Sequence, residues 1–557
     1  MLWPGRVTLV LPMRRITLAA LVAAGGAGCA ADATESSHCG GGKCDGADEL
    51  ADALDGRGDP VARWIRDQTV ASNGSIKADF ADILGGVREI QGCTESSVRT
   101  FVVSDDLITS EEPFPRLVSV ACAGDNSRAS EFFLAASFEL FAGDGDEPTG
   151  EIDTRALEMF AWDETARTYR FYATEPVGAD PQTGIRFEVE PERCRGCHLT
   201  PTDLAATGMP MTPIMNELTR PWTHWNAEPG FPSHEFEVPD RVARSESFEE
   251  LAKAHLGPAS ELEQIIRAGQ DRVALTRMRG RRDSPPSHEA VMALLRPVFC
   301  EEQVNYVSEE FESGILPTAS LIDPGIRTLF LQVRASWTWD WVNVGQLRLP
   351  SGTTDVDQTP VRGNADVITE GHLGALGVLS PMKLLQVRAL DWKRPVFSSF
   401  RCGLWKDAQE RFEDDPPDLS GANRNSDAVP IVFDAIMTMG GQLLTTGDDD
   451  TVLAVAEATA TRMGKVVDAL EGGALADADC AGDGFCATDL DAWGDAIDDH
   501  IATFQSGSTA RSKIRTRRAE RICEILRVVE PGDDRFDAED LPIRFANRPS
   551  LPKVDCD

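Results

Sequence analysis

The stretch Met159-Phe-Ala-Trp162 is followed by Asp163-Glu-Thr-Ala166 and then by Tyr169-Arg-Phe171-Tyr172. Two short runs rich in aromatic residues, separated by polar turn residues, are typical of a β-hairpin. We expect the aromatic side chains to form core contacts and cross-strand pairs rather than a ligand cage. The stretch therefore predicts two antiparallel strands.

Runs of the same kind on both sides extend this hairpin into a sheet. Each run is short, rich in β-branched and aromatic residues, and bounded by Gly, Asp, Asn or Pro. The runs cover residues 99–103, 117–122, 131–141, 156–162, 169–173 and 185–189. They predict an antiparallel β-rich domain over residues 61–190, with short helices in 60–65 and 78–90 before the first strand.

The last run leads directly into Cys194-Arg-Gly-Cys197-His198. Two cysteines spaced by two residues and followed at once by histidine form the c-type haem attachment pattern. In this pattern two thiols bind the porphyrin as thioethers and the histidine is the proximal iron ligand. The pentapeptide resembles that of the c-type cytochromes, and the resemblance covers only these residues and their immediate surroundings. It implies one covalent haem c, held by Cys194, Cys197 and His198.

The same pentapeptide has other interpretations. A CxxC pair can form a redox-active or structural disulfide, or supply half of a zinc site. The sequence has no second CxxC to complete a zinc site and no second CxxCH. A single haem excludes a multihaem wire, and it excludes the two-haem arrangement of bacterial cytochrome c peroxidases unless the protein dimerises.

Several residues after the pentapeptide could bind the iron on its distal side. Met211 lies 13 residues after His198, and a chain that extends roughly 3.3 Å per residue can pass around the porphyrin edge. His224 would instead give bis-histidine iron at a lower potential. Met209 and Met215 are further candidates, although any of these methionines could simply line an apolar pocket. A distal site that is open to a small ligand or peroxide is the third possibility.

The N-terminus carries an export signal. Arg14 and Arg15 precede the apolar run 16–24, which is followed by Gly25-Gly-Ala-Gly-Cys29. Small residues that lead into a cysteine resemble the bacterial lipoprotein signal, in which Cys29 would be lipid-modified, although Gly26 stands where leucine is usual. The resemblance implies a lipid anchor in the cell envelope, in the outer membrane, facing the periplasm or at the cell surface. A plain secretory signal is the alternative.

The cysteine count is consistent with export. The chain has 13 cysteines, and ten remain after Cys29, Cys194 and Cys197 are assigned to lipid and haem. Ten cysteines could form five disulfides in an oxidising compartment. We expect the local pairs to be Cys39 with Cys44, Cys93 with Cys122, and Cys480 with Cys486.

Length and charge bound the organisation of the chain. A chain of 557 residues is too long for one compact core, so several domains are expected. We predict an exported multi-domain α+β protein with a signal peptide (1–28), a flexible tether (29–60), the β-rich domain (61–190), a haem segment with a helical cover (191–300), and a mainly helical region (301–557). The formal charge of -37 argues against binding nucleic acid and favours a basic partner.

The function expected from these features is one-electron transfer by a monohaem lipoprotein. The sequence contains no Walker loop, GxGxxG motif after a strand, HExxH or GxSxG, so phosphate-binding, dinucleotide-binding, metalloprotease and hydrolase interpretations lose support. An electron carrier is therefore favoured over a catalyst. A haem enzyme or gas sensor with an open distal site is the first alternative. A surface binding or scaffold lipoprotein with a structural haem is the second.

Overall fold

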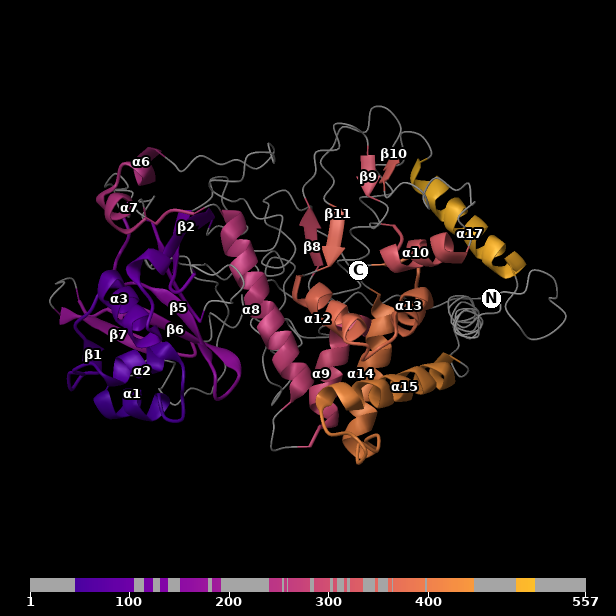
Figure 1. Cartoon of the computed structure of the whole chain (residues 1–557), viewed down its shortest axis with the longest axis horizontal. Helices are drawn as coiled ribbons and strands as arrows, with labels where there is room; N and C mark the ends of the chain where they lie inside the picture. Colours follow the sequence, from indigo (N-terminus) through magenta and orange to yellow (C-terminus); the bar gives the residue numbers. More distant parts are fainter. Residues whose placement is uncertain are drawn as a thin grey trace, which may run out of the picture.

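The computed structural model has a mixed α+β fold, as the sequence predicts. Figure 1 shows a sheet with its own helices on one side and a helical part on the other, with a long helix between them. The structure describes residues 46–104, 115–123, 131–138, 151–178, 183–191, 240–252, 255–257, 259–280, 285–300, 304–307, 315–317, 321–333, 346–348, 359–362, 364–395, 398–444 and 487–505.

The main sheet is antiparallel and has the strand order β1-β7-β6-β5-β4-β3-β2. Its strands are β1 (Ser75–Ile76), β2 (Arg99–Ser104), β3 (Pro115–Val120), β4 (Phe132–Ser137), β5 (Glu158–Asp163), β6 (Thr168–Pro176) and β7 (Ile185–Val189). Strands β2 to β7 each pair with the next strand along the chain, so the sheet is a meander closed at one edge by β1. Each predicted run corresponds to one of these strands.

Strands β5 and β6 form the predicted hairpin. Met159 lies opposite Tyr172, and Trp162 lies opposite Tyr169. The rings of Trp162 and Tyr169 meet edge to face with centroids 5.1 Å apart, and that geometry is favourable for aromatic pairs. The aromatic residues therefore form cross-strand pairs, as expected.

Both faces of the sheet are covered, because alternate residues of the hairpin point to opposite sides. Met159 and Ala161 are buried in a core with residues of three short helices, whereas Phe160 and Trp162 belong to a second, aromatic core. The three helices of the first core are α1 (Ala47–Ala53), α2 (Pro60–Arg66) and α3 (Phe80–Gln91). Helices α6 (Asp240–Ala243) and α7 (Glu246–Leu251) add residues to the same core.

The second face of the sheet packs on α8 (Ala259–Arg279), the long helix of Figure 1. Leu262, Ile265, Ile266 and Val273 of α8 are buried against the aromatic residues of the sheet. Helix α8 lies within the segment predicted to form the haem segment and its helical cover (191–300). Its apolar face packs on the sheet.

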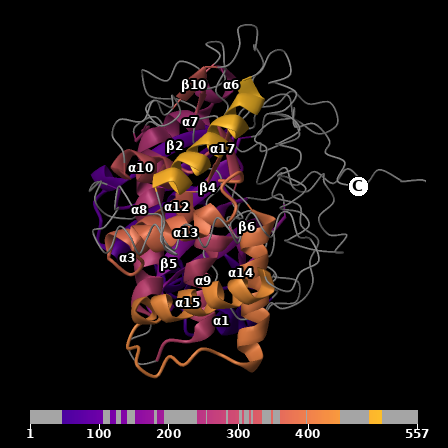
Figure 2. The same cartoon turned by 90° about the vertical axis from the view of Figure 1, so that its right-hand side faces the viewer.

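The helical part has its own core, formed by residues of α8, α9, α12, α13, α14 and α15. The new helices are α9 (His288–Phe299), α10 (Pro324–Val333), α12 (Asn364–Ala375), α13 (Pro381–Leu390), α14 (Ser399–Asp414), α15 (Asn425–Leu444) and α17 (Ala487–Gln505). Figures 1 and 2 both place α12 beside α8, and the two helices are in contact.

The structure differs from the sequence-based boundaries at three places. Helix α1 lies inside the stretch predicted to be a flexible tether (29–60), and its Leu50 is buried in the core. A proline in a helical pattern predicts that the helix ends before it, but α9 continues past Pro297 to Phe299, because the apolar residues of its last turn are buried. Region 301–557 also contains two strand pairs, β8 (Val304–Val307) with β11 (Thr359–Arg362) and β9 (Ile315–Pro317) with β10 (Gln346–Arg348).

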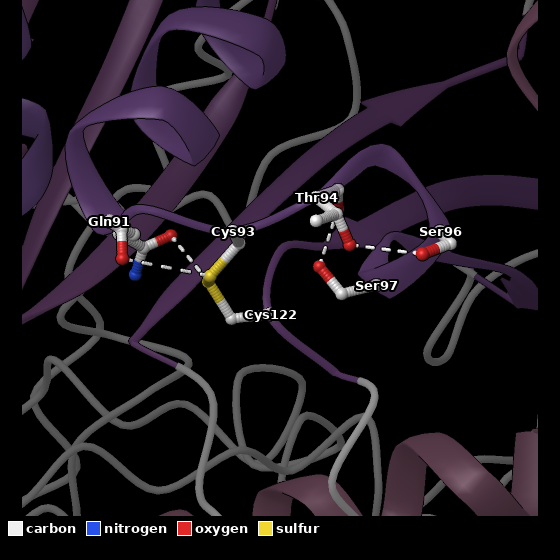
Figure 3. Close-up of a disulfide and its surroundings, with 6 residues drawn as sticks. All are labelled: Gln91, Cys93, Thr94, Ser96, Ser97 and Cys122. Carbon is white, nitrogen blue, oxygen red and sulfur yellow. Dashed lines mark hydrogen bonds between the residues drawn. A yellow bond between two sulfur atoms is a disulfide. The ribbon is translucent and has the colours of Figure 1, made fainter.

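One disulfide links the sheet to helix α3. Cys93 follows Gly92, the left-handed residue that ends α3, and Cys122 follows the end of β3. These two cysteines are joined, as their sequence positions predict, and Gln91 lies beside the bond (Figure 3). The other two predicted pairs, Cys39 with Cys44 and Cys480 with Cys486, lie outside the described residues.

A second disulfide closes the helical part. Cys300 at the end of α9 is bonded to Cys402 of α14, and both side chains are fully buried. The two half-cystines are 102 residues apart in the sequence. The bond therefore restrains a much longer loop of the unfolded chain than the bond between Cys93 and Cys122, which are 29 residues apart.

Removing each disulfide by a double Cys→Ala substitution should destabilise the protein, and the longer loop should cost more. Chain entropy predicts a loss of about 5 kcal/mol for Cys300–Cys402 and about 4 kcal/mol for Cys93–Cys122. Chemical denaturation of the two variants, exported as full chains, measures both losses. A larger loss for the shorter loop would contradict the entropic explanation.

Candidate functional site

The residues predicted to bind haem, iron or lipid all lie outside the described residues. They are Cys29, Cys194, Cys197, His198, Met209, Met211, Met215 and His224. The described chain reaches Pro191, three residues before Cys194, and begins again at Asp240. The residues at the end of β7, up to Pro191, are therefore the described residues that directly precede the pentapeptide in the sequence.

The backbone changes direction at Glu190. Val189 is the last residue of β7 and lies opposite Tyr172, and the Glu190 N–H still donates to the carbonyl of Phe171 at 2.9 Å. Glu190 itself has a φ of 53°, in the left-handed region. A non-glycine residue in this region costs about 1–2 kcal/mol, so its surroundings must hold it there. Pro191, the next residue, is buried.

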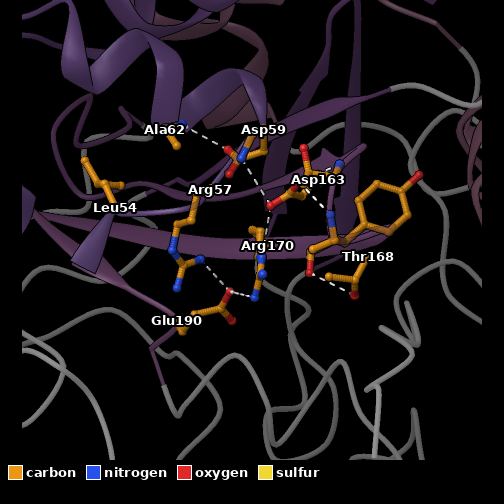
Figure 4. Close-up of polar contacts among 12 residues, drawn as sticks. Leu54, Arg57, Asp59, Ala62, Asp163, Thr168, Arg170 and Glu190 are labelled. Carbon is orange, nitrogen blue, oxygen red and sulfur yellow. Dashed lines mark hydrogen bonds and ion pairs between the residues drawn. The ribbon is translucent and has the colours of Figure 1, made fainter. Parts of the chain in front are cut away.

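The side chain of Glu190 belongs to a polar cluster, which we call the Glu190 network. It consists of Arg57, Asp59, Asp163, Arg170, Tyr172 and Glu190, and Figure 4 shows most of its contacts.

Two guanidinium groups hold Glu190. Its Oε1 accepts a hydrogen bond from Arg57 Nη1 at 2.8 Å and lies 3.6 Å from Arg170 Nη1. Arg57 is itself anchored, because its Nε donates to the carbonyl of Ala53 at 2.8 Å and its guanidinium lies 5.9 Å from the centre of the Tyr172 ring. These contacts connect the end of β7 to the helices at the start of the described chain.

Asp163 organises the hairpin turn. Its carboxylate is fully buried, and Oδ1 accepts hydrogen bonds from the N–H groups of Thr165 and Ala166 at 2.9 and 3.0 Å. A carboxylate that bonds to the backbone two and three residues ahead is a common way to close a turn. Its Oδ2 accepts from Gly58 N–H at 3.2 Å and lies 3.4 Å from Arg170 Nε. A side chain at position 58 would clash, because an added Cβ would lie 2.8 Å from Thr165 Oγ1.

Asp59 connects the sheet to α2. Its Oδ1 accepts from Ala62 N–H at 2.9 Å, which caps the N-terminus of α2, and its Oδ2 accepts from the Tyr172 hydroxyl at 2.7 Å. Both Asp59 and Tyr172 are fully buried. A buried carboxylate needs such donors, because water cannot reach it.

The pKa values of Asp59 and Asp163 shift in opposite directions. Burial raises the pKa of Asp59, the nearby Asp163 adds to this rise, and the hydrogen bonds from Ala62 and Tyr172 oppose it. For Asp163 burial also acts to raise the pKa, but the N–H groups of Ala166 and Gly58 and the charge of Arg170 outweigh it and bring the pKa below 3.8. Asp163 therefore carries a charge at neutral pH.

The pKa values of Arg57 and Tyr172 respond to the same charges. Burial acts to lower the pKa of Arg57, but Tyr172 and Glu190 together outweigh burial and raise it. The guanidinium therefore stays protonated. Burial and Asp59 raise the pKa of Tyr172, which therefore keeps its hydroxyl proton as the donor to Asp59. The network thus places two guanidinium groups against the carboxylates at the end of β7, and their contacts restrain the backbone there.

The sequence did not single out this network. Arg57 and Glu190 are 133 residues apart, and Asp59 and Tyr172 are 113 residues apart. Asp163 was assigned only to the hairpin turn, and the other members of the network carry no motif. The only local signal is a polar residue directly after the last strand.

Comparison of the chain with protein-family models, curated proteins and solved structures gives no match. Within the described ranges, no group of three or more His, Cys, Asp or Glu side chains is placed to hold a metal ion. None of the helices in that same part of the chain is long and apolar enough to cross a membrane. The pentapeptide and the described residues that precede it are therefore the features of this chain that point to a function.

Replacing Asp163 with Asn should destabilise the protein in a pH-dependent way. The native pKa lies below the unfolded value of 3.8, so the stabilisation is present above that value and is lost as pH falls through the native pKa. We expect Asp163→Asn to lower the free energy of unfolding by about 1–3 kcal/mol at pH 7, and by less at pH 3. Thermal and urea unfolding across this range measure the difference.

Asp153 provides a matched control. It accepts a hydrogen bond from Arg155 N–H at 2.9 Å in a similar turn, but its side chain is 34% exposed. Asp153→Asn should change stability much less than Asp163→Asn at pH 7, because water can replace the lost interaction. An equal loss for Asp163→Asn at both pH values would contradict the charge-based explanation.

Proposed function

We propose that the protein is a c-type haem-binding lipoprotein of the cell envelope that transfers one electron at a time. The observation that carries the proposal is the sequence Cys194-Arg-Gly-Cys197-His198. Its donor set fits haem c, because two thiols at this spacing suit thioether bonds and the adjacent imidazole suits the iron. The bound haem would supply reversible one-electron chemistry. Met211 or His224 would complete the iron site, with Met209 and Met215 as alternatives.

The disulfides support the exported location. Cys122 of the first disulfide packs against the core of the sheet and its helices, and Cys300–Cys402 joins the end of α9 to α14 in the helical part. Structural disulfides persist in oxidising compartments and are rare in the cytosol, and c-type haem attachment needs the same export. The signal that ends at Cys29 agrees with this location, with a lipid anchor as the connection to the membrane.

Charge supports a basic redox partner. The formal charge of -37 is large for 557 residues and would attract a cationic surface, with association rates that fall as salt rises. Nucleic acid would be repelled by the same charge. We therefore propose a basic electron donor or acceptor as the partner.

The proposed organisation is a β-rich domain (61–190), a haem segment (191–300) and a mainly helical region (301–557). In this arrangement the sheet supports the haem segment, and the helical region is far larger than an electron carrier requires. The separate core and disulfide of the helical part favour a second candidate function, in which this region binds a surface partner and the haem is structural.

The full chain, exported together with a c-type haem maturation system, should carry one covalent haem. A pyridine haemochrome spectrum should be that of a haem with two thioether bonds, and mass spectrometry should find the haem on the peptide that contains residues 194–198. Cys194→Ser combined with Cys197→Ser should abolish covalent attachment. Cys93→Ala combined with Cys122→Ala is the matched control and should retain it.

The spectrum also separates the candidate functions. A low-spin ferric haem indicates an endogenous methionine or histidine ligand and supports electron transfer. A high-spin haem that binds carbon monoxide rapidly on reduction indicates an open site and supports an enzyme or sensor. Colourless protein, with Cys194 and Cys197 oxidised to each other, would overturn the proposal.

A further inference from the structure

The Glu190 network lies close to the pentapeptide for a covalent reason. Glu190 precedes Cys194 by four residues, and an extended chain covers at most about 3.6 Å per residue, so their Cα atoms are no more than about 14 Å apart. Arg57 and Arg170 contact the same Glu190 carboxylate oxygen. Three charged side chains are therefore tied to the immediate neighbourhood of the first thioether cysteine.

We propose that the Glu190 network is the charged support of the haem: it fixes the direction in which the chain leaves β7, and its charges tune the reduction potential. This inference rests on the proposed function. In it, Arg57, Arg170 and Glu190 are positioning residues that act on the cofactor through the backbone and through their electric field.

The positioning role follows from the conformation of Glu190. Its left-handed φ is unfavourable for a side chain, and its carboxylate is held by the two guanidinium groups. Arg57 is in turn fixed by Ala53 and stacked near the Tyr172 ring. Strained backbone that is held by surrounding contacts is frequent at functional sites. Here the held residue is the last one before the proline that begins the path to Cys194.

The electrostatic role follows from burial. The side chains of Arg57 and Glu190 are only 13% and 26% exposed, so solvent screens their charges less than those of surface residues. Ferric haem carries one more positive charge than ferrous haem. A nearby carboxylate therefore stabilises the ferric state and lowers the reduction potential, whereas a nearby guanidinium raises it. In the intact pair these effects oppose each other, so removing one partner should reveal the other.

The experiment removes each charge of the Arg57–Glu190 pair in turn and compares the effect with removing each charge of a matched pair. Arg116 and Glu158 are 2.6 Å apart, and their side chains are 11% and 29% exposed. They lie on β3 and β5 of the same sheet, and β6 separates β5 from β7. The variants are Glu190→Gln, Arg57→Met, Glu158→Gln and Arg116→Met, each in the full haem-loaded chain. The measurement is the midpoint potential from a redox titration followed by absorbance.

We expect Glu190→Gln to raise the midpoint potential and Arg57→Met to lower it, while the two control variants shift it less. Arg57→Lys keeps the positive charge and should return the potential toward that of the unchanged protein. If Arg57→Met does not fold, Arg57→Gln replaces it. Shifts of the midpoint potential with the same sign for Glu190→Gln and Arg57→Met would overturn the inference, because a general loss of structure should shift the potential in the same direction in both variants. Shifts no larger than those of the controls would also overturn it.

A second readout needs no haem. In the chain that carries Cys194→Ser and Cys197→Ser, the Glu190 N–H that bonds to Phe171 should exchange with solvent faster after Glu190→Gln or Arg57→Met than after Arg116→Met. Equal exchange in all variants would overturn the positioning role. Colourless wild-type protein would remove the proposed function and this inference together. A coloured protein whose potential ignores the network would remove the inference alone.

Discussion

Strand β7 pairs with β6 from Ile185 opposite Pro176 to Val189 opposite Tyr172, and this register decides where the chain leaves the sheet. A shift by one residue would exchange the two faces of β7 and move Glu190 away from Arg57 and Arg170. The same register places Tyr172 where its hydroxyl reaches Asp59 at the start of α2. The sheet, its helices and the exit toward the pentapeptide thus depend on one set of backbone hydrogen bonds.

The sheet can be this specific because both of its faces are buried. Residues of the hairpin alternate between a core with α1 to α3 and an aromatic core with α8. Helix α8 also contacts α12 and α15, so it connects the sheet to the helical part. The Arg272 guanidinium of α8 lies 5.2 Å from the centre of the Trp162 ring and adds a cation–π contact to this packing.

Electrostatics near the end of β7 combines two needs of a buried site. Asp59 and Asp163 satisfy backbone N–H groups at a helix start and in a hairpin turn, so they stabilise the local fold. Arg57 and Arg170 pair with Glu190 at the point where the chain turns. The chain has 54 basic residues against 91 acidic ones, and two of its arginines contact the Glu190 carboxylate at this exit.

The sequence by itself determined the strands, the antiparallel hairpin and the Cys93–Cys122 pair, because these features depend on residues that are close along the chain. It also supplied the pentapeptide at 194–198 and the N-terminal pattern that predicts export, and both are local patterns. The helix inside the expected tether, the extension of α9 past Pro297 and the Glu190 network were decided by tertiary structure. Their members come together across more than a hundred residues, as Arg57 and Glu190 do. Burial and charge pairing select such contacts only once the chain has folded.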